Sequence, residues 1–204
     1  MKKRKGIKKR EMVVLAIGVI FIVFGVAALI NTIIQGNPTQ ILWICYSSLI
    51  LLGIGILMRN SLLVVSQLNI ITIPLLIWTA DFIFFIINKQ SFFGIVNYFF
   101  MPGPILSKII TTQHLFTIPL ALIAVYIIKV KTKYAWIVSL AQVSFLFLIT
   151  IMLTAPVNNI NCVYSSCVNF NFKHHQVMWF VITFTIICCT NLVLSQIKAL
   201  KNKF

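Results

Sequence analysis

The chain has 204 residues, of which 60% are hydrophobic and 9% charged, and its mean hydropathy is +1.03. Only two residues are acidic against 17 lysines and arginines, so the formal net charge is +15. This composition excludes a soluble globular domain, because too few polar groups are present to cover its surface, and indicates a protein that crosses a membrane several times.

Six apolar runs are each long enough to cross about 30 Å of hydrocarbon at roughly 1.5 Å per helical residue. The predicted spans are residues 12–34, 41–58, 62–87, 105–128, 134–155 and 177–197. We therefore expect an all-α bundle of six transmembrane helices in one domain at 12–197, between a basic segment at 1–11 and a basic tail at 198–204. Pro74 and Pro119 lie inside predicted spans and predict kinks, because proline has no N–H to donate.

Lysine and arginine are distributed unevenly between the two sides of this bundle. One side carries Lys2, Lys3, Arg4, Lys5, Lys8, Lys9, Arg10, Arg59, Lys129, Lys131, Lys133, Lys198, Lys201 and Lys203. The other side carries Lys89, Lys108 and Lys173. Because basic residues in short connections favour the cytoplasm, we expect an integral cell-membrane protein with both termini cytoplasmic.

The basic segment before the first span reads as the start of a retained signal anchor. Two roles fit it: fixing the topology alone, or also binding anionic lipid at the membrane surface. The lipid-binding residues would be Lys2, Lys3, Arg4, Lys5, Lys8, Lys9 and Arg10. Beyond the lipid bilayer, no nucleic-acid partner is expected, because there is no folded basic domain, and the sequence identifies no protein partner.

Asp81 is the only acidic residue within a predicted span, roughly 30 Å from the inner start of that span and so near the outer interface. A carboxylate in a membrane is costly unless paired, so Asp81 is either functional or paired with a lysine such as Lys89 or Lys108. His114 lies in the first turns of the fourth span, toward the same side. An Asp–His pair is a sufficient general base, which makes Asp81 and His114 the candidate catalytic residues.

The outer connection at 156–176 is rich in side chains that both donate and accept hydrogen bonds. Such groups can orient a lipid headgroup, or can simply cap turns and helix ends. The candidate substrate-binding residues are Asn158, Asn159, Asn161, Tyr164 and His175.

Cys162 and Cys167 are spaced C-x4-C on the predicted oxidising side. Three states are open to them: a structural disulfide, free thiols, or a zinc site completed by His174 or His175. The disulfide is favoured, because the spacing matches no zinc-ribbon pattern. We expect no metal and no cofactor.

Three functions remain open, because the chain contains no G-x-S-x-G, H-E-x-x-H, GxGxxG or P-loop motif. The first is a membrane-embedded enzyme acting on a lipid or amphiphile at the outer leaflet. The second is a non-catalytic structural or assembly protein. The third is a small transporter or channel with Asp81 as a cation or proton site, although the inner halves of the spans are almost without polar residues. The exceptions are Ser66, Asn69, Thr72, Gln142 and Ser144.

One series of residues between 74 and 185 forms a pattern: Trp78, Asp81-Phe82, Gly94, Tyr98, His114, Pro119-Leu120, Pro156 and Asn159-Ile160-Asn161-Cys162-Val163-Tyr164. With this pattern, residues 74–185 resemble an uncharacterised family of small multi-pass membrane proteins with an N-I-N-W-V-type outer loop. It implies a site on the outer face, with Cys162 standing where the family pattern has tryptophan. More faintly, the chain looks like the YwaF-like integral membrane family, some of whose relatives are linked to phospholipid acyl transfer.

Overall fold

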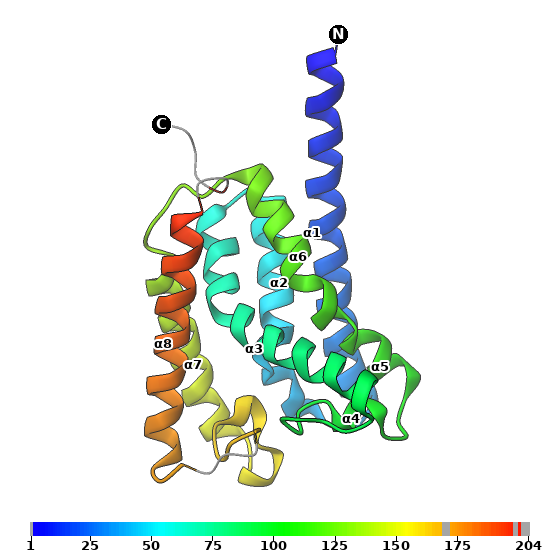
Figure 1. Ribbon diagram of the computed structural model, residues 1–204, viewed down its shortest axis with the longest axis vertical. Helices are drawn as coiled ribbons and strands as arrows, with labels where there is room; N and C mark the ends of the chain where they lie inside the picture. The colour runs from blue at the N-terminus through cyan, green and yellow to red at the C-terminus, as the bar shows by residue number, and fades with distance from the viewer. Residues whose placement is uncertain (1, 169–171, 198–199, 201–204) are drawn as a thin grey trace.

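The protein is described by a computed structural model covering residues 2–168, 172–197 and 200. Every regular element among these residues is a helix, and Figure 1 shows the long helices running alongside one another in a bundle. The elements are α1 (Lys2–Ile34), η1 (Pro38–Leu42), α2 (Ile44–Leu57), α3 (Ser61–Asn88), α4 (Asn97–Phe100), α5 (Ile105–Thr111), α6 (Gln113–Ile128), α7 (Ala135–Leu153), η2 (Pro156–Asn158), η3 (Ile160–Cys162) and α8 (His175–Gln196). The side chains of Lys2, Lys3, Arg4 and Lys5, and all of Lys198, Lys201 and Lys203, lie outside the described residues.

Five helices are long and apolar enough to cross a membrane: Lys8–Ile34, Ser61–Asn88, Ile105–Ile128, Ala135–Leu153 and His175–Gln196. The predicted span at 41–58 forms a shorter helix, because η1 ends at Leu42, Trp43 has an extended backbone, and α2 then has only 14 residues. At 1.5 Å per residue α2 is about 21 Å long. The all-α prediction is confirmed, and the described residues form five helices that could span a membrane and one shorter apolar helix.

The connections between the long helices fall at two opposite ends of the bundle (Figure 1). At the end where α1 begins and α8 finishes, which we call the basic end, Arg59 forms an ion pair with Glu11 at 3.3 Å. The N–H of Lys131 donates to the Ser61 hydroxyl there at 3.2 Å, which joins two connections. The opposite end, which we call the loop end, carries the connections at 35–43, 89–104 and 154–174.

Glycines allow α1 and α2 to pack closely. A Cβ placed on Gly53 would lie 2.5 Å from Cγ1 of Ile22 and 2.8 Å from the carbonyl oxygen of Gly18. A Cβ on Gly25 would lie 2.6 Å from Cγ1 of Ile50. Small residues stabilise helix pairs in membranes in this way, because close van der Waals packing replaces the hydrophobic effect between helices.

Helix α3 is the centre of the bundle, in contact with α2, α6, α7 and α8. Pro74 lies within α3 and Pro119 within α6, as the sequence predicts. The fourth predicted span is interrupted at Thr112, where α5 ends and α6 begins. The arrangement places the halves of α3, α7 and α8 nearest the loop end beneath the connection that follows α7.

Gly53→Leu should loosen the α1–α2 pair, because the new side chain meets Ile22 and the backbone of Gly18. We expect the free energy of unfolding to fall by about 1–3 kcal/mol. The measurement is thermal unfolding of the purified protein in detergent. Gly103→Leu is the control, since nothing lies within 4 Å of a Cβ at Gly103. Equal melting temperatures for the two variants would contradict close packing at Gly53.

Candidate functional site

Asp81 is fully buried in α3, and its carboxylate folds the connection that follows the helix. Its oxygens accept five hydrogen bonds, from the Ser91 hydroxyl (2.5 Å) and the backbone N–H groups of Phe92 (2.7 Å), Phe93 (2.9 Å), Ile95 (3.2 Å) and Val96 (3.3 Å). A carboxylate has about four lone-pair sites, so this charge is fully satisfied by residues 91–96.

This arrangement corrects the predicted pairing of Asp81 with a lysine. Lys89 instead donates from Nζ to the carbonyl oxygen of Ile86 at 3.0 Å. The buried charge is stabilised by backbone dipoles and one hydroxyl, which is the alternative to an ion pair for a carboxylate inside a membrane protein. Asp81 therefore has a structural role in this fold that residue spacing alone did not indicate.

His114 lies at the start of α6, with its ring stacked on Trp78 at 4.7 Å between ring centroids. Its Nδ1 is 2.7 Å from the carbonyl oxygen of Thr111 and must donate there, because a carbonyl only accepts. Trp78 donates from Nε1 to the Tyr98 hydroxyl at 3.0 Å. Among the described residues no hydrogen bond joins Asp81 to His114. The hydrogen bonds of the two candidate catalytic residues go to separate partners.

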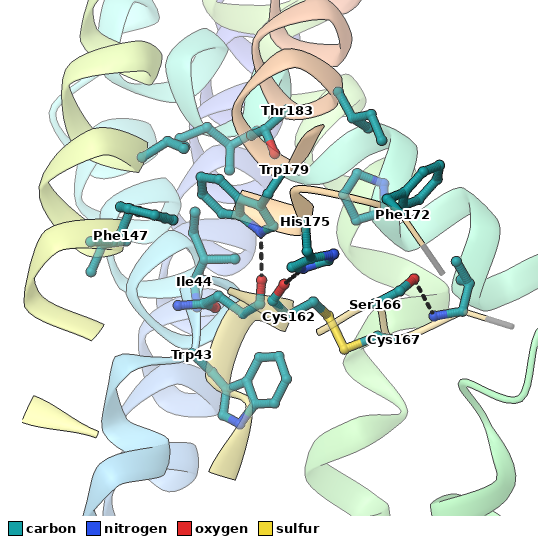
Figure 2. Close-up of a pocket in the computed structure, with 17 residues that line it drawn as sticks. Trp43, Ile44, Phe147, Cys162, Ser166, Cys167, Phe172, His175, Trp179 and Thr183 are labelled. Atoms are coloured by element: carbon teal, nitrogen blue, oxygen red, sulfur yellow. Dashed lines mark hydrogen bonds between the residues drawn. A yellow bond between two sulfur atoms is a disulfide. The ribbon is translucent and has the colours of Figure 1, made fainter. Parts of the chain in front are cut away.

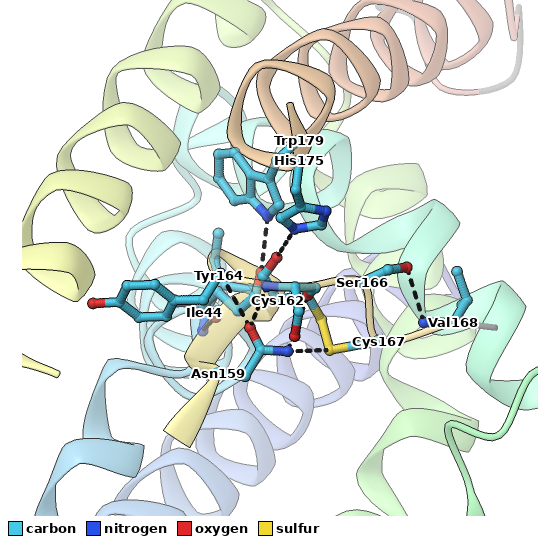
Figure 3. Close-up of a disulfide and its surroundings, with 11 residues drawn as sticks. Ile44, Asn159, Cys162, Tyr164, Ser166, Cys167, Val168, His175 and Trp179 are labelled. Atoms are coloured by element: carbon cyan, nitrogen blue, oxygen red, sulfur yellow. Dashed lines mark hydrogen bonds between the residues drawn. A yellow bond between two sulfur atoms is a disulfide. The ribbon is translucent and has the colours of Figure 1, made fainter. Parts of the chain in front are cut away.

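Asn159 and Tyr164 hold the turn that follows α7 (Figure 3). Oδ1 of Asn159 accepts from the N–H groups of Tyr164 (3.1 Å) and Ser165 (3.0 Å). The Tyr164 hydroxyl donates to the carbonyl oxygen of Thr154 at 2.7 Å, at the end of α7. Asn159 has a φ of 38°, in the left-handed region that asparagine tolerates better than most residues. Asn159 therefore caps backbone N–H groups within the turn, and Tyr164 caps a carbonyl at the end of α7.

Asn161 fastens the same turn to the start of α2. Its Oδ1 accepts from the N–H of Ile44 at 2.8 Å, and its Nδ2 donates to the carbonyl oxygen of Leu42 at 2.8 Å. Its own carbonyl oxygen accepts from Nε1 of Trp179 at 2.9 Å, which adds α8. By contrast, Asn158 is exposed and makes no side-chain hydrogen bond within the described part of the chain.

Cys162 and Cys167 form a disulfide with their Cα atoms 5.5 Å apart (Figure 3). Of the three states left open by the sequence, the structure has the disulfide, which uses both thiols that a zinc site would need. Nε2 of His175 lies 2.8 Å from the carbonyl oxygen of Cys162, so this nitrogen donates and connects the first turn of α8 to the loop. We call residues 155–168 the disulfide loop.

Beneath the disulfide loop lies a partly open cavity of about 310 Å³, lined by α3, α7, α8 and the start of α2 (Figure 2). Its lining is mostly apolar and consists of Trp43, Ile44, Ile70, Pro74, Val143, Leu146, Phe147, Asn161, Cys162, Ser166, Cys167, Val168, Phe172, His175, Trp179, Ile182 and Thr183. This volume is at the lower end of the range of small-molecule sites. The cavity reaches from the first turn of α8 to Thr183, about 12 Å along the helix axis.

The residues selected from the sequence fall into three places. Asn161, His175 and the two cysteines line the cavity, while Asn159 and Tyr164 lie within the disulfide loop that covers it. Asp81 lines a different hollow of about 280 Å³ with Phe84, Phe92 and Phe93. His114 lines neither of these two spaces.

A buried polar layer, which sequence analysis recognised only in part, joins α3, α7 and α8 toward the basic end. Gln67 and Gln142 exchange hydrogen bonds of 2.8 and 3.1 Å. Asn69 donates to the Ser139 hydroxyl at 3.3 Å and to Oδ1 of Asn191 at 3.1 Å. Gln67, Ser139 and Asn191 were missed. The sequence could have indicated them, because each lies about 6–12 Å from the basic end of its helix, and polar residues at the same depth in neighbouring helices can meet.

Comparison of the chain with protein-family models, with curated proteins and with solved structures finds no match in any of the three.

Asp81→Asn should open the connection at 91–96, because an amide NH₂ would face donors that now bind a carboxylate. Each lost hydrogen bond to a charged group costs about 1.5–3 kcal/mol, so hydrogen exchange at residues 92–96 should rise about tenfold or more. Exchange is followed by mass spectrometry on the purified protein. Lys89→Gln is the control and should leave exchange unchanged. Protection equal to wild type in Asp81→Asn would show that the carboxylate does not fold this segment.

Asn161→Ala should destabilise the loop end far more than Asn158→Ala, although the two residues lie three positions apart. The first change leaves the N–H of Ile44 and the carbonyl of Leu42 without partners, which costs about 1–3 kcal/mol. Chemical unfolding in detergent measures the difference in the free energy of unfolding. Similar losses in the two variants would contradict the bridging role of Asn161.

Proposed function

We propose that this protein binds a single-chain amphiphile from the bilayer, with the apolar chain in the cavity between α3, α7 and α8. The observation that carries the proposal is the 310 Å³ apolar cavity beneath a disulfide-closed loop. A space of this size takes one chain more readily than the two chains of a phospholipid. Surrounding lipid supplies such ligands directly, since the walls are membrane-spanning helices.

The orientation we propose follows from the distribution of lysine and arginine. With the basic end in the cytoplasm, both termini are cytoplasmic and the cavity faces the outer leaflet of the cell membrane. The short helix α2, extended by η1, then completes a sixth crossing. Lys8, Lys9 and Arg10 are exposed at the basic end, in keeping with the predicted contact between this segment and anionic lipid.

The headgroup of the ligand would lie at the loop end, beside Lys173 and His175. Lys173 is exposed and lies in the chain between the lining residues Phe172 and His175. His175 uses Nε2 for the carbonyl of Cys162, and its Nδ1 has no partner among the described residues. An exposed ammonium group next to an apolar cavity favours an anionic headgroup such as a phosphate or carboxylate, and Nδ1 of the neutral His175 ring can accept from a hydroxyl on the same headgroup.

Of the hypothesis of an enzyme that acts on a lipid or amphiphile, the geometry supports binding of the amphiphile but not a reaction. A general base was expected from Asp81 and His114, but the carboxylate is occupied by residues 91–96 and the imidazole Nδ1 by Thr111. Catalytic groups must come within hydrogen-bond reach of one another or of the substrate. The proposal therefore assigns ligand recognition and no reaction.

Filling the cavity should abolish binding. Leu146→Trp adds a ring to the cavity wall, whereas Leu148→Trp places the same ring on a surface of α7 where the side chain is 57% exposed. We expect the first variant to bind at least about tenfold more weakly, because overpacking costs about 1–3 kcal/mol. Scintillation proximity with radiolabelled lysophosphatidic acid measures the affinity in detergent. Equal affinity in the two variants, or none in wild type, would refute the proposal.

A further inference from the structure

The helices α3, α7 and α8, which line the cavity, also carry the buried polar layer. This layer lies next to the cavity, on the side nearer the basic end. In α3, Asn69 immediately precedes the lining residue Ile70, and in α7, Gln142 immediately precedes the lining residue Val143. Both helices run from the basic end to the loop end, so each polar residue lies one step nearer the basic end than its apolar neighbour. The cavity and the polar layer therefore follow one another along the same three helices.

Several hydrogen-bonding groups between α3 and α8 have no partner in the described part of the chain. Oδ1 of Asn69 and Oγ1 of Thr190 are buried without one. Thr183, which is half-buried, lines the cavity, and no hydrogen bond of its side chain is seen among the described residues. Pro74 has no N–H, so the carbonyl oxygen of Ile70 lacks its usual helical donor. An unpaired polar group in an apolar interior costs several kcal/mol, and in a membrane nothing outside the bundle can offset that cost.

One apolar side chain separates these groups along α8. Thr183, Ile187 and Thr190 are spaced by four and three residues and so lie on one face of the helix. Ile187 is fully buried and belongs to the same hydrophobic core as Ile70 and Val143. Along about 10 Å of this face of α8, the Thr183 hydroxyl is followed by the apolar side chain of Ile187 and then by the Thr190 hydroxyl.

We propose that the seam between α3 and α8 is a translocation path, along which the polar head of the bound amphiphile crosses the membrane. This inference rests on the proposed function, because the cavity supplies the starting site. The anionic group of the head would accept from the hydroxyls of Thr183 and then Thr190, while a hydroxyl on the same head would donate to the Ile70 carbonyl and then to Oδ1 of Asn69. Ile187 is the barrier between the two sets.

The charges at the basic end fit an anionic head arriving there. Lys131 and Lys133 are exposed in the connection between α6 and α7, and α7 carries the Ser139 and Gln142 of the polar layer. Lys173 is exposed at the opposite end. An anion released at the basic end would therefore enter a positive potential stronger than the one it left.

The test uses the full-length protein in phosphatidylcholine vesicles with radiolabelled lysophosphatidic acid. Albumin extracts the lysolipid from the outer leaflet, so the rate at which label becomes protected from extraction measures transfer across the bilayer. We expect wild type to transfer label at least about tenfold faster than protein-free vesicles, which corresponds to a barrier lower by about 1.4 kcal/mol. Ile187→Ser should transfer faster still, and Leu192→Ser, at a lipid-facing position that is 60% exposed, should match wild type.

Asn69→Leu and Thr190→Val remove the unpaired polar atoms with little change in shape and should slow transfer about tenfold while binding in detergent stays unchanged. Thr190→Val is the conservative change, and it decides the matter if Asn69→Leu does not elute as a monodisperse protein. Wild-type binding without transfer, or transfer unaffected by Thr190→Val and Ile187→Ser, would overturn the path and leave the proposed function standing. Loss of binding in wild type would overturn both.

Discussion

The hydrogen bonds of Asn161 are the interaction on which the loop end of this bundle depends. One side chain satisfies the backbone on both sides of Trp43, where η1 ends and α2 begins, and its own carbonyl receives the indole N–H of Trp179. A membrane offers no water for backbone groups at a broken helix, so such a break requires a partner of this kind. The short α2, the covered cavity and the position of α8 all follow from it.

Asp81 shows that a buried charge, like a buried backbone group, needs hydrogen-bond partners from the protein itself. An ionisable residue inside a membrane is a functional candidate by default, because its burial is costly. Here four backbone N–H groups and a hydroxyl repay that cost by organising residues 91–96. The buried carboxylate is then a folding element, and the loop that it closes packs the aromatic rings of Phe92 and Phe93 against one another.

The helices could be predicted from the sequence because hydropathy depends only on local composition. All six apolar runs are helical, and the errors are at boundaries: η1 replaces the start of the second run, and Thr112 divides the fourth. These breaks depend on partners far along the chain, since the start of α2 is bound by a residue 117 positions away. A single sequence contains no signal for such a contact.

The sequence could select the residues of the candidate site but not their hydrogen-bond partners. Asn161, Cys162 and Cys167 line the cavity, yet the amide of Asn161 binds the start of α2 and the two sulfur atoms bind each other. Residue type indicates that a side chain can bind, whereas only the register between helices decides what it binds. Gln67 and Gln142 are 75 residues apart and meet because α3 and α7 align at one level.

The polar groups without hydrogen-bond partners are therefore not the ones that residue type alone would select as functional. Asp81 and, in the disulfide loop, Asn159 and Asn161 are paired, whereas Oδ1 of Asn69 and the Thr190 hydroxyl are buried without a partner in the described part of the chain. In water an unpaired hydroxyl means little, because solvent completes it. Inside a membrane bundle it keeps most of its cost, so a fold that retains several along one seam is less stable than an all-apolar seam would be. A polar ligand passing along that seam would recover the lost hydrogen bonds, which is why the seam between α3 and α8 is a better place to look for function than Asp81.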